Sequence, residues 1–113
     1  MPNESGNDAI LVLTNLPDTA SAEKLAEILV GAQLAACVNI LAPCTSLYHW
    51  QGKLERASEL PMMIKTTRQH YQAIESTILK HHPYKLPEII CVNIDAGLPA
   101  YLDWVAAINV SPT

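Results

Sequence analysis

The chain has 113 residues, a net charge of −4 and a pI of about 5.4, and it contains no phenylalanine. Its length is typical of a single domain with one aliphatic core. The acidic balance and the lack of a basic amphipathic run or a long apolar run argue against nucleic acid and membranes as partners.

The first eight residues are polar and acidic, without the positive region and apolar core of a signal peptide. We expect residues 1–8 to form a disordered tail and residues 9–113 to form one domain. The three cysteines, Cys37, Cys44 and Cys91, are an odd number at no metal-ligand spacing. This pattern predicts reduced core thiols in a cytoplasmic protein.

The first two predicted elements are a strand and a helix. Residues 9–14 form a continuous apolar run, which favours a strand buried on both faces. A helix follows the turn that begins at Pro17, and either Thr19 or Ser21 can cap it. Small and apolar side chains recur along this helix at steps of three and four residues, so one of its faces should pack against the core.

A long hairpin comes next. Two β-like stretches, residues 36–50 and 53–67, are joined by Gln51-Gly52, and a two-residue link with glycine indicates a tight turn. Such a turn places Pro43 and Pro61 at nearly the same level of the ladder. Proline cannot donate a ladder hydrogen bond, so we expect the ribbon to bend or to change partners there.

Each stretch of the hairpin would span roughly 50 Å, which is longer than the helices beside it. The hairpin should therefore project and expose apolar side chains near its tip. Proteins cover such strand edges, and a second copy of the chain is the simplest cover. We predict self-association, with Tyr48, Trp50 and Trp104 as packing anchors.

The rest of the chain completes a known order of elements. A helix is predicted from about Gln69 to His81, a strand over residues 88–95, and a short helix from Pro99. The order β-α-β-β-α-β plus a C-terminal helix predicts an α+β, ferredoxin-like sandwich with an extended hairpin between its second and third strands. Two right-handed crossovers would put both long helices on one face of an antiparallel sheet.

Five segments, in this order and spacing, resemble the CutA divalent-cation-tolerance family: LAACVNI (34–40), YHWQGK (48–53), IKTT (64–67), HPY with PEI (82–89) and YLDW (101–104). The resemblance runs from about residue 9 to residue 108. It implies a cytoplasmic homotrimer in which each hairpin pairs with a neighbouring subunit, with an architecture similar to that of PII signalling proteins. It also implies a role in tolerance of divalent metal ions such as copper.

The chain departs from the family pattern at three places. Lys85 stands where members usually carry an acidic residue, and Ala57 and Pro61 interrupt a strand that is often richer in glutamate. Thr14 stands where some members have a cysteine proposed as a copper ligand. A thiolate ligand is therefore missing at that position.

His81 and His82 are candidate metal ligands, because neutral imidazole commonly binds copper, zinc and nickel. Adjacent helical residues point about 100° apart, so the pair needs a further ligand from elsewhere. Stabilisation of the helix C-terminus by histidine is the alternative reading. We predict weak binding of Cu(II) or another divalent cation and no organic cofactor.

The resemblance also implies an intersubunit cleft lined by Asn39, Glu59, Lys65, Tyr84 and Glu88. These residues either form interface salt bridges and hydrogen bonds or bind a small ligand. The second reading gives an alternative function, a PII-like sensor of a small anionic metabolite.

No catalytic motif is present: the sequence has no glycine-rich phosphate loop, no HExxH or CxxC motif and no nucleophile elbow. Cys37 lies in an apolar strand, which argues against a lowered thiol pKa. We predict that the protein is not an enzyme.

Overall fold

The predicted order of elements is present in the computed structural model, which describes residues 8–109. Of the predicted tail, residues 1–8, the first seven lie outside this range. The stretch predicted as the first strand of the hairpin, residues 36–50, is interrupted in the structure and forms two separate strands. The elements are β1 (Ala9–Leu16), α1 (Thr19–Gly31), β2 (Cys37–Ile40), β3 (Cys44–Trp50), β4 (Lys53–Thr67), a 3-10 turn (Arg68–His70), α2 (Tyr71–His81), β5 (Ile90–Asn93), α3 (Pro99–Ala106) and a second 3-10 turn (Ala107–Asn109).

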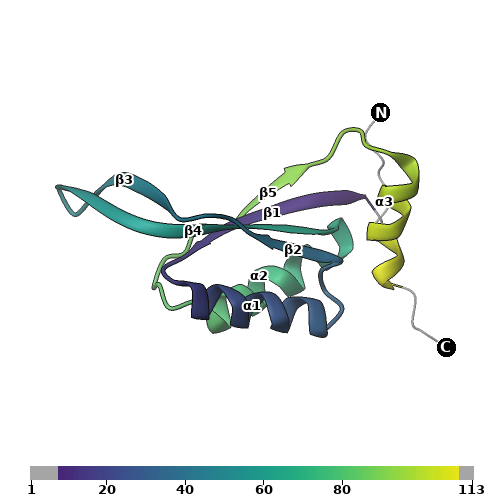
Figure 1. The fold of residues 1–113 in the computed structure, drawn as a ribbon, viewed down its shortest axis with the longest axis horizontal. Coiled ribbons are helices and arrows are strands. Elements are labelled where there is room, and N and C mark those ends of the chain that lie inside the picture. Colours follow the sequence, from purple (N-terminus) through teal and green to yellow (C-terminus); the bar gives the residue numbers. More distant parts are fainter. Residues whose placement is uncertain (1–7, 110–113) are drawn as a thin grey trace.

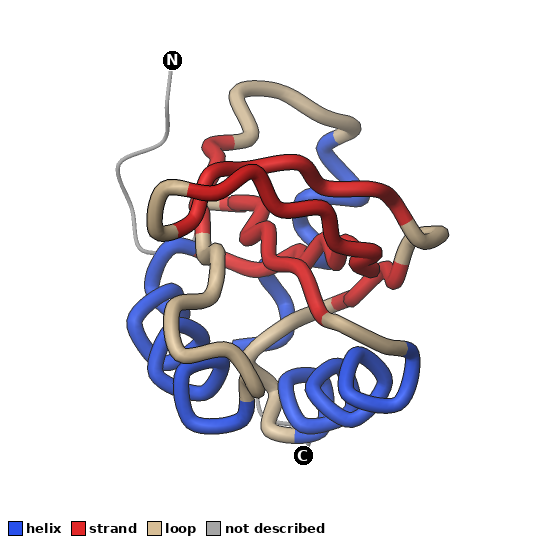
Figure 2. The backbone as a smooth tube through the Cα atoms, turned by 90° about the vertical axis from the view of Figure 1, so that its left-hand side faces the viewer, coloured by secondary structure: helices blue, strands red, loops and turns tan. Residues whose placement is uncertain are grey.

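The strands form one antiparallel sheet in the order β2-β4-β1-β5, and β3 pairs with the distal part of β4. Helices α1 and α2 both lie on one face of this sheet (Figure 1), and the end-on view shows them below the strands (Figure 2). Both crossovers therefore return to the same face, as right-handed connections require. The prediction of a ferredoxin-like α+β fold is confirmed.

The core lies between the sheet and the two long helices. Even-numbered residues of β1, and those of β4 from Leu60 onward, point toward the helices, because side chains alternate along a strand. The fully buried apolar residues include Ile10, Val12, Leu25, Leu29, Met62, Ile64, Ile74 and Ile78. The odd-numbered residues of β1 are only partly buried. The expectation that this strand is buried on both faces is therefore wrong, because α1 and α2 cover one face only.

The N-cap of helix α1 lies one residue before Thr19, the first of the two predicted caps. Asp18, rather than Thr19 or Ser21, is the N-cap, and its Oδ1 accepts a hydrogen bond of 2.7 Å from the backbone N–H of Ser21. Hydrogen bonds from the backbone and side chain of Ser21 lower the pKa of Asp18. An ionised carboxylate is well placed there, because it accepts from an otherwise unpaired N–H at the positive end of the helix.

The hairpin is irregular at the two prolines, where a bend or a change of partner is predicted: β4 stays the partner on both sides, and the register shifts by one residue. Ile40 pairs with Met62, whereas Cys44 pairs with Glu59, so three residues of one strand face two of the other. The extra residue makes a bulge, which bends a ribbon and increases its twist. The backbone N–H of Leu41 still bonds to the carbonyl of Pro61 at 2.9 Å. The carbonyl of Pro61 thus accepts a hydrogen bond at a level of the ladder where its ring nitrogen cannot donate one.

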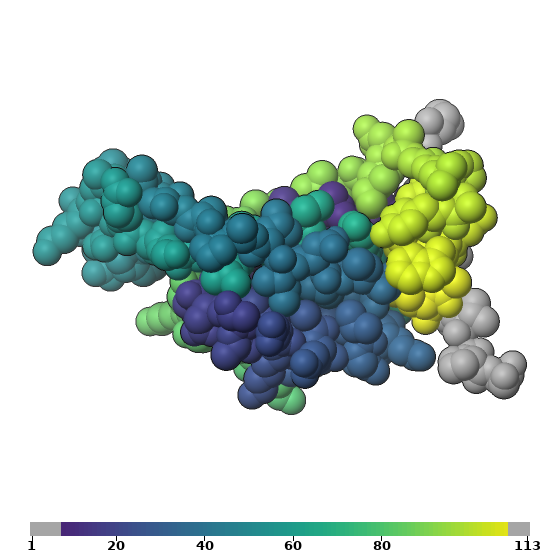
Figure 3. Space-filling model, viewed as in Figure 1, coloured from purple at the N-terminus to yellow at the C-terminus, as the bar shows by residue number. Residues whose placement is uncertain are grey.

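Beyond this bulge, β3 and β4 continue as a two-stranded ribbon. Trp50 pairs with Lys53 across Gln51-Gly52, in the predicted register. Gln51 and Gly52 have φ values of 52° and 82°, which match the tight turn that suits a right-twisted hairpin. The ribbon forms an arm that projects past the helices (Figure 3) and lengthens the molecule to 49 × 31 × 23 Å. The radius of gyration is 15.0 Å, against about 13 Å for a typical globule of this length.

Asp8 belongs to the folded domain, although the sequence placed it in the tail. The residue is buried, and its backbone carbonyl accepts a hydrogen bond of 2.8 Å from the N–H of Arg68. Its carboxylate also lies 3.7 Å from the guanidinium of Arg68. These contacts join the start of β1 to the end of β4.

Candidate functional site

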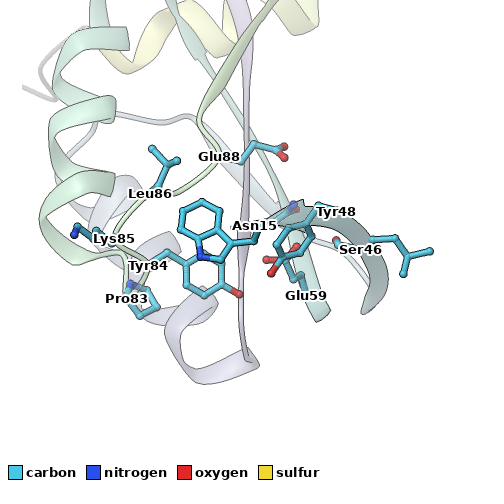
Figure 4. Close-up of a pocket in the computed structure, with 11 residues that line it drawn as sticks. Asn15, Ser46, Tyr48, Glu59, Pro83, Tyr84, Lys85, Leu86 and Glu88 are labelled. Carbon is cyan, nitrogen blue, oxygen red and sulfur yellow. The ribbon is translucent and has the colours of Figure 1, made fainter. Parts of the chain in front are cut away.

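A cavity of about 850 Å³ lies where the base of the arm meets the loop that follows α2 (Figure 4). Three segments build it: the end of β1, the strands of the arm, and residues 83–88. Alternation along β3 places Ser46, Tyr48 and Trp50 on the face that lines the cavity. Pro83 ends α2, and the loop after it brings Tyr84 and Glu88 to the opposite side.

Glu59 and Tyr84 meet at the wall of this cavity. Glu59 is 7% exposed. Burial, a hydrogen bond to Glu59 and the charge of that carboxylate raise the pKa of Tyr84 to about 12. The phenol therefore stays protonated at neutral pH and donates to the carboxylate. Figure 4 shows the Tyr84 hydroxyl turned toward Glu59 and the Lys85 side chain turned away from it.

His82 fixes the loop that carries Tyr84. The histidine is buried, its Nε2 lies 2.6 Å from the carbonyl oxygen of Asn15, and its Nδ1 accepts from the N–H of Tyr84 at 3.1 Å. Both ring nitrogens are therefore engaged, and the partners assign the proton to Nε2. His82 therefore has a structural role. The lone pair of its Nδ1 accepts from Tyr84, so it is not available to a metal ion.

His81 lies at the last position of α2 and is exposed. The fold thus sends the two predicted metal ligands, His81 and His82, to different environments, as their angular separation on a helix indicated. Within residues 8–109, no group of three or more His, Cys, Asp or Glu side chains is arranged to hold a metal ion. A metal site that uses His81 stays a prediction.

Thr14, the residue at the family's cysteine position, points into the core. It is 1% exposed, and its Oγ1 has no hydrogen-bond partner. A side chain at this position is therefore enclosed by the sheet and the helices.

The five predicted cleft residues separate into two groups. Glu59, Tyr84 and Glu88 line the cavity beneath the arm. Asn39 and Lys65 instead lie on the sheet strands β2 and β4, where Asn39 pairs with Met63 and Lys65 with Cys37. The Nζ atom of Lys65 lies 5.7 Å from the ring centroid of Tyr101, which is within the range of a cation–π contact.

Apolar side chains are exposed on the arm, on β5 and on α3. They include all three predicted assembly residues, Tyr48, Trp50 and Trp104, together with Leu54, Ile90 and Val92. Leu11 pairs with Val92, and Leu13 with Ile90, so these four side chains share the sheet face opposite α1 and α2. The sequence predicts a strand over residues 88–95, but it does not show that Ile90 and Val92 lie on a sheet face that no helix covers.

Asn15 and Ser46 also line the cavity and were not predicted. Alternation along β3 identifies Ser46 once Tyr48 is assigned to the site. Asn15 carries no such local signal, because its place depends on a contact with His82, 67 residues away.

These features define a ferredoxin-like α+β domain with a projecting arm and a ligand-sized cavity at its base. The chain belongs to the CutA1 divalent ion tolerance protein family, whose model matches residues 10–108. It is 44% identical over 103 residues to the divalent-cation tolerance protein CutA of Yersinia pestis (strain Pestoides F), covering 91% of this chain and 87% of that protein. The family predicted from the sequence is confirmed.

Solved structures agree with this assignment. CutA from Xylella fastidiosa matches with a TM-score of 0.87 at 42% identity, covering 89% of this chain and 97% of that one. The periplasmic divalent cation tolerance protein CutA from Archaeoglobus fulgidus matches with a TM-score of 0.86 at 33% identity, covering 88% and 97%.

The Archaeoglobus protein corrects the predicted location. The cytoplasmic assignment came from the cysteine pattern and from the family resemblance, but this relative is described as periplasmic. The cytoplasmic prediction is therefore withdrawn. Among residues 8–109, no helix is long and apolar enough to cross a membrane. The three cysteines are free thiols in this structure.

Proposed function

We propose that this protein contributes to divalent-cation tolerance as a homotrimer that binds Cu(II) or a similar divalent ion weakly, without catalysing a reaction. Membership of the divalent ion tolerance family supports the general role. The proposed assembly is supported by the apolar surface that the described residues leave exposed to solvent.

That surface has two parts. On the arm, Trp50 is 48% exposed and Leu54 is 69% exposed. On the body, Ile90, Val92 and the partly buried Leu11 form a patch on the sheet face that α1 and α2 do not cover. Patches of this kind mark interaction surfaces. Copies of the chain that covered both parts would also protect the open edges of the arm.

The metal would be held through His81. This imidazole is exposed at the C-terminal end of α2, so it can take further ligands from water or from a neighbouring copy. A site with few protein ligands should bind far more weakly than a closed four-ligand zinc site. It should also weaken below about pH 6, because a protonated imidazole must release its proton to bind.

The alternative, a PII-like sensor of an anionic metabolite, has less support. Two carboxylates, Glu59 and Glu88, line the cavity beside a single lysine, Lys85. The balance of charge in the cavity is negative and repels an anion. The related proteins reported above are named for divalent-cation tolerance.

Light scattering tests the assembly. Three copies of the 12.4 kDa chain would have a mass of about 37 kDa. Trp50→Asp should weaken association, because it places a charge in the interface. Leu79→Asp is the matched control, since Leu79 is exposed to a similar extent on α2, away from both apolar surfaces. A monomeric wild type, or equal losses in both variants, would contradict the proposed interface.

Calorimetric titration with Cu(II) at pH 7.5 tests the metal site. His81→Ala should abolish most of the binding heat, whereas His49→Ala, which removes an exposed histidine from the arm, should retain it. Equal heats from wild type and His81→Ala would place the metal elsewhere.

A further inference from the structure

The cavity beneath the arm contains a buried carboxylate without a cationic partner. Glu59 is 7% exposed, and its hydrogen bond comes from the neutral hydroxyl of Tyr84. Among residues 8–109, the only ion pair joins Arg68 to Asp8, so no lysine, arginine or histidine neutralises Glu59. A charge removed from water is costly unless an opposite charge approaches it. The site therefore favours a ligand that brings a positive charge.

Aromatic side chains form much of the rest of the wall. Tyr48 and Trp50 come from β3, and Tyr84 comes from the loop after α2. The faces of aromatic rings attract cations, and a group of such rings is the usual means of recognising an ammonium ion. Lys85 extends away from Glu59 (Figure 4), so its charge does not occupy this position.

The same lining disfavours a metal ion. Borderline metals prefer imidazole or thiolate, and no histidine or cysteine lines the cavity. Magnesium and calcium need six or more oxygen ligands in a defined shell. No cluster of three or more metal-binding side chains exists within the described residues. A volume of about 850 Å³ instead suits a small organic molecule.

We propose that this cavity binds an organic ammonium ion, with Glu59 as the counter-charge and Tyr48 and Tyr84 as the aromatic wall. This ligand and these residues differ from the divalent ion and His81 of the proposed function, so the two proposals can fail separately. Tyr48 and Trp50 are also predicted to contact a neighbouring copy. A copy packed against the arm would cover the open side of the cavity and exclude water, which strengthens the attraction to the carboxylate.

The experiment compares a cation with its neutral counterpart. The assembled protein is titrated calorimetrically with n-butylammonium chloride and with 1-butanol, at constant ionic strength maintained with sodium chloride. The two probes have the same carbon chain, so their difference measures the charge. We expect n-butylammonium to bind roughly tenfold more tightly than 1-butanol, as expected for a charge-assisted contact.

Glu59→Gln removes the charge but keeps an oxygen that can accept from Tyr84. It should reduce the preference for the ammonium probe roughly tenfold. Glu27→Gln is the control for the loss of one carboxylate, because Glu27 is exposed on α1 and does not line the cavity. It should leave both affinities unchanged. Tyr48→Leu, at a half-exposed position, should weaken the ammonium probe severalfold without changing the charge of the site.

Circular dichroism checks that each variant is folded. If Glu59→Gln does not fold, Tyr48→Leu still tests the proposal. Equal affinity for the two probes, or an unchanged preference in Glu59→Gln, would overturn the proposal. It would also be overturned if Zn²⁺ bound in a Glu59-dependent way while n-butylammonium did not, because the cavity would then be a metal site.

Discussion

The Nε2 atom of His82 lies 2.6 Å from the carbonyl oxygen of Asn15, and this contact ties the loop after α2 to the end of β1. The other ring nitrogen accepts from the N–H of Tyr84. Asn15 and Tyr84 both line the cavity. One buried imidazole therefore positions two walls of the candidate site, although it does not itself face a ligand.

Replacing this imidazole should be costly. His82→Ala would leave the carbonyl of Asn15 and the N–H of Tyr84 without their partners and would open a small cavity. We expect the free energy of unfolding to fall by about 2–4 kcal/mol, measured by urea denaturation. His81→Ala, at the exposed neighbouring position, should change it by less than about 0.5 kcal/mol. Similar losses of unfolding free energy in the two variants would mean that His82 does not have this structural role.

Two buried threonines should respond in opposite directions to the same substitution. The Oγ1 of Thr14 has no partner, whereas that of Thr66 donates to the carbonyl of Leu34 at 2.6 Å. Thr14→Val should raise the free energy of unfolding by roughly 1 kcal/mol, because it removes an unsatisfied buried hydroxyl. Thr66→Val should lower it by roughly as much. A loss of stability in Thr14→Val would indicate that its hydroxyl has a partner, such as a buried water.

Tyrosine titration, followed by ultraviolet absorbance, should detect the Tyr84–Glu59 contact. Burial first, and then the hydrogen bond and charge of Glu59, raise the pKa of Tyr84 to about 12. Tyr71 behaves similarly because of Glu75. Two of the four tyrosines should therefore titrate about two pH units late, and Tyr84→Phe should remove one of them. Glu59→Gln should lower the pKa of Tyr84 without returning it to the ordinary value, since burial remains.

The raised pKa of Tyr84 also predicts a loss of stability at high pH. The unfolded chain releases this proton near pH 10, whereas the folded protein retains it until about pH 12. The stabilisation is therefore complete below pH 10 and disappears between these values. Tyr84→Phe should show a shallower decline of Tm in this range. Parallel declines would contradict the linkage.

Acid should destabilise the protein through His70. Partial burial lowers the pKa of this imidazole from its ordinary value of 6.5. The unfolded state thus binds the proton more readily, so stability is complete above pH 6.5 and decreases as the pH falls through the lower, folded-state pKa. The difference in Tm between wild type and His70→Gln should narrow between pH 7.5 and pH 5. A pH-independent difference would exclude this role.

Much of the fold could be predicted because its signals are local. Helical spacing, the proline that ends α2 and the Gln51-Gly52 turn each act within a few residues. The turn also determines the register of the arm, because a two-residue link leaves one pairing of Trp50 with Lys53. The two prolines then indicated where that register changes. Five short segments in order were enough to identify the family.

The candidate site was only partly predictable. Glu59, Tyr84 and Glu88 were identified through the family resemblance, but the sequence did not separate them from Asn39 and Lys65. That separation depends on the bulge and on which face of the sheet each residue occupies. Nor did the sequence distinguish His81 from His82. Only the contact between the segment after α2 and the end of β1 buries His82, while His81 stays exposed.

The sequence by itself determined the order of elements, the long hairpin and the family, because each depends on residue spacing or on a single turn. The tertiary structure decided which polar groups meet: His82 with Asn15, and Tyr84 with Glu59. These pairs come from segments far apart in the chain, and the sheet and helices bring them together. Their hydrogen bonds and the uncompensated charge of Glu59 depend on burial, which no local pattern specifies.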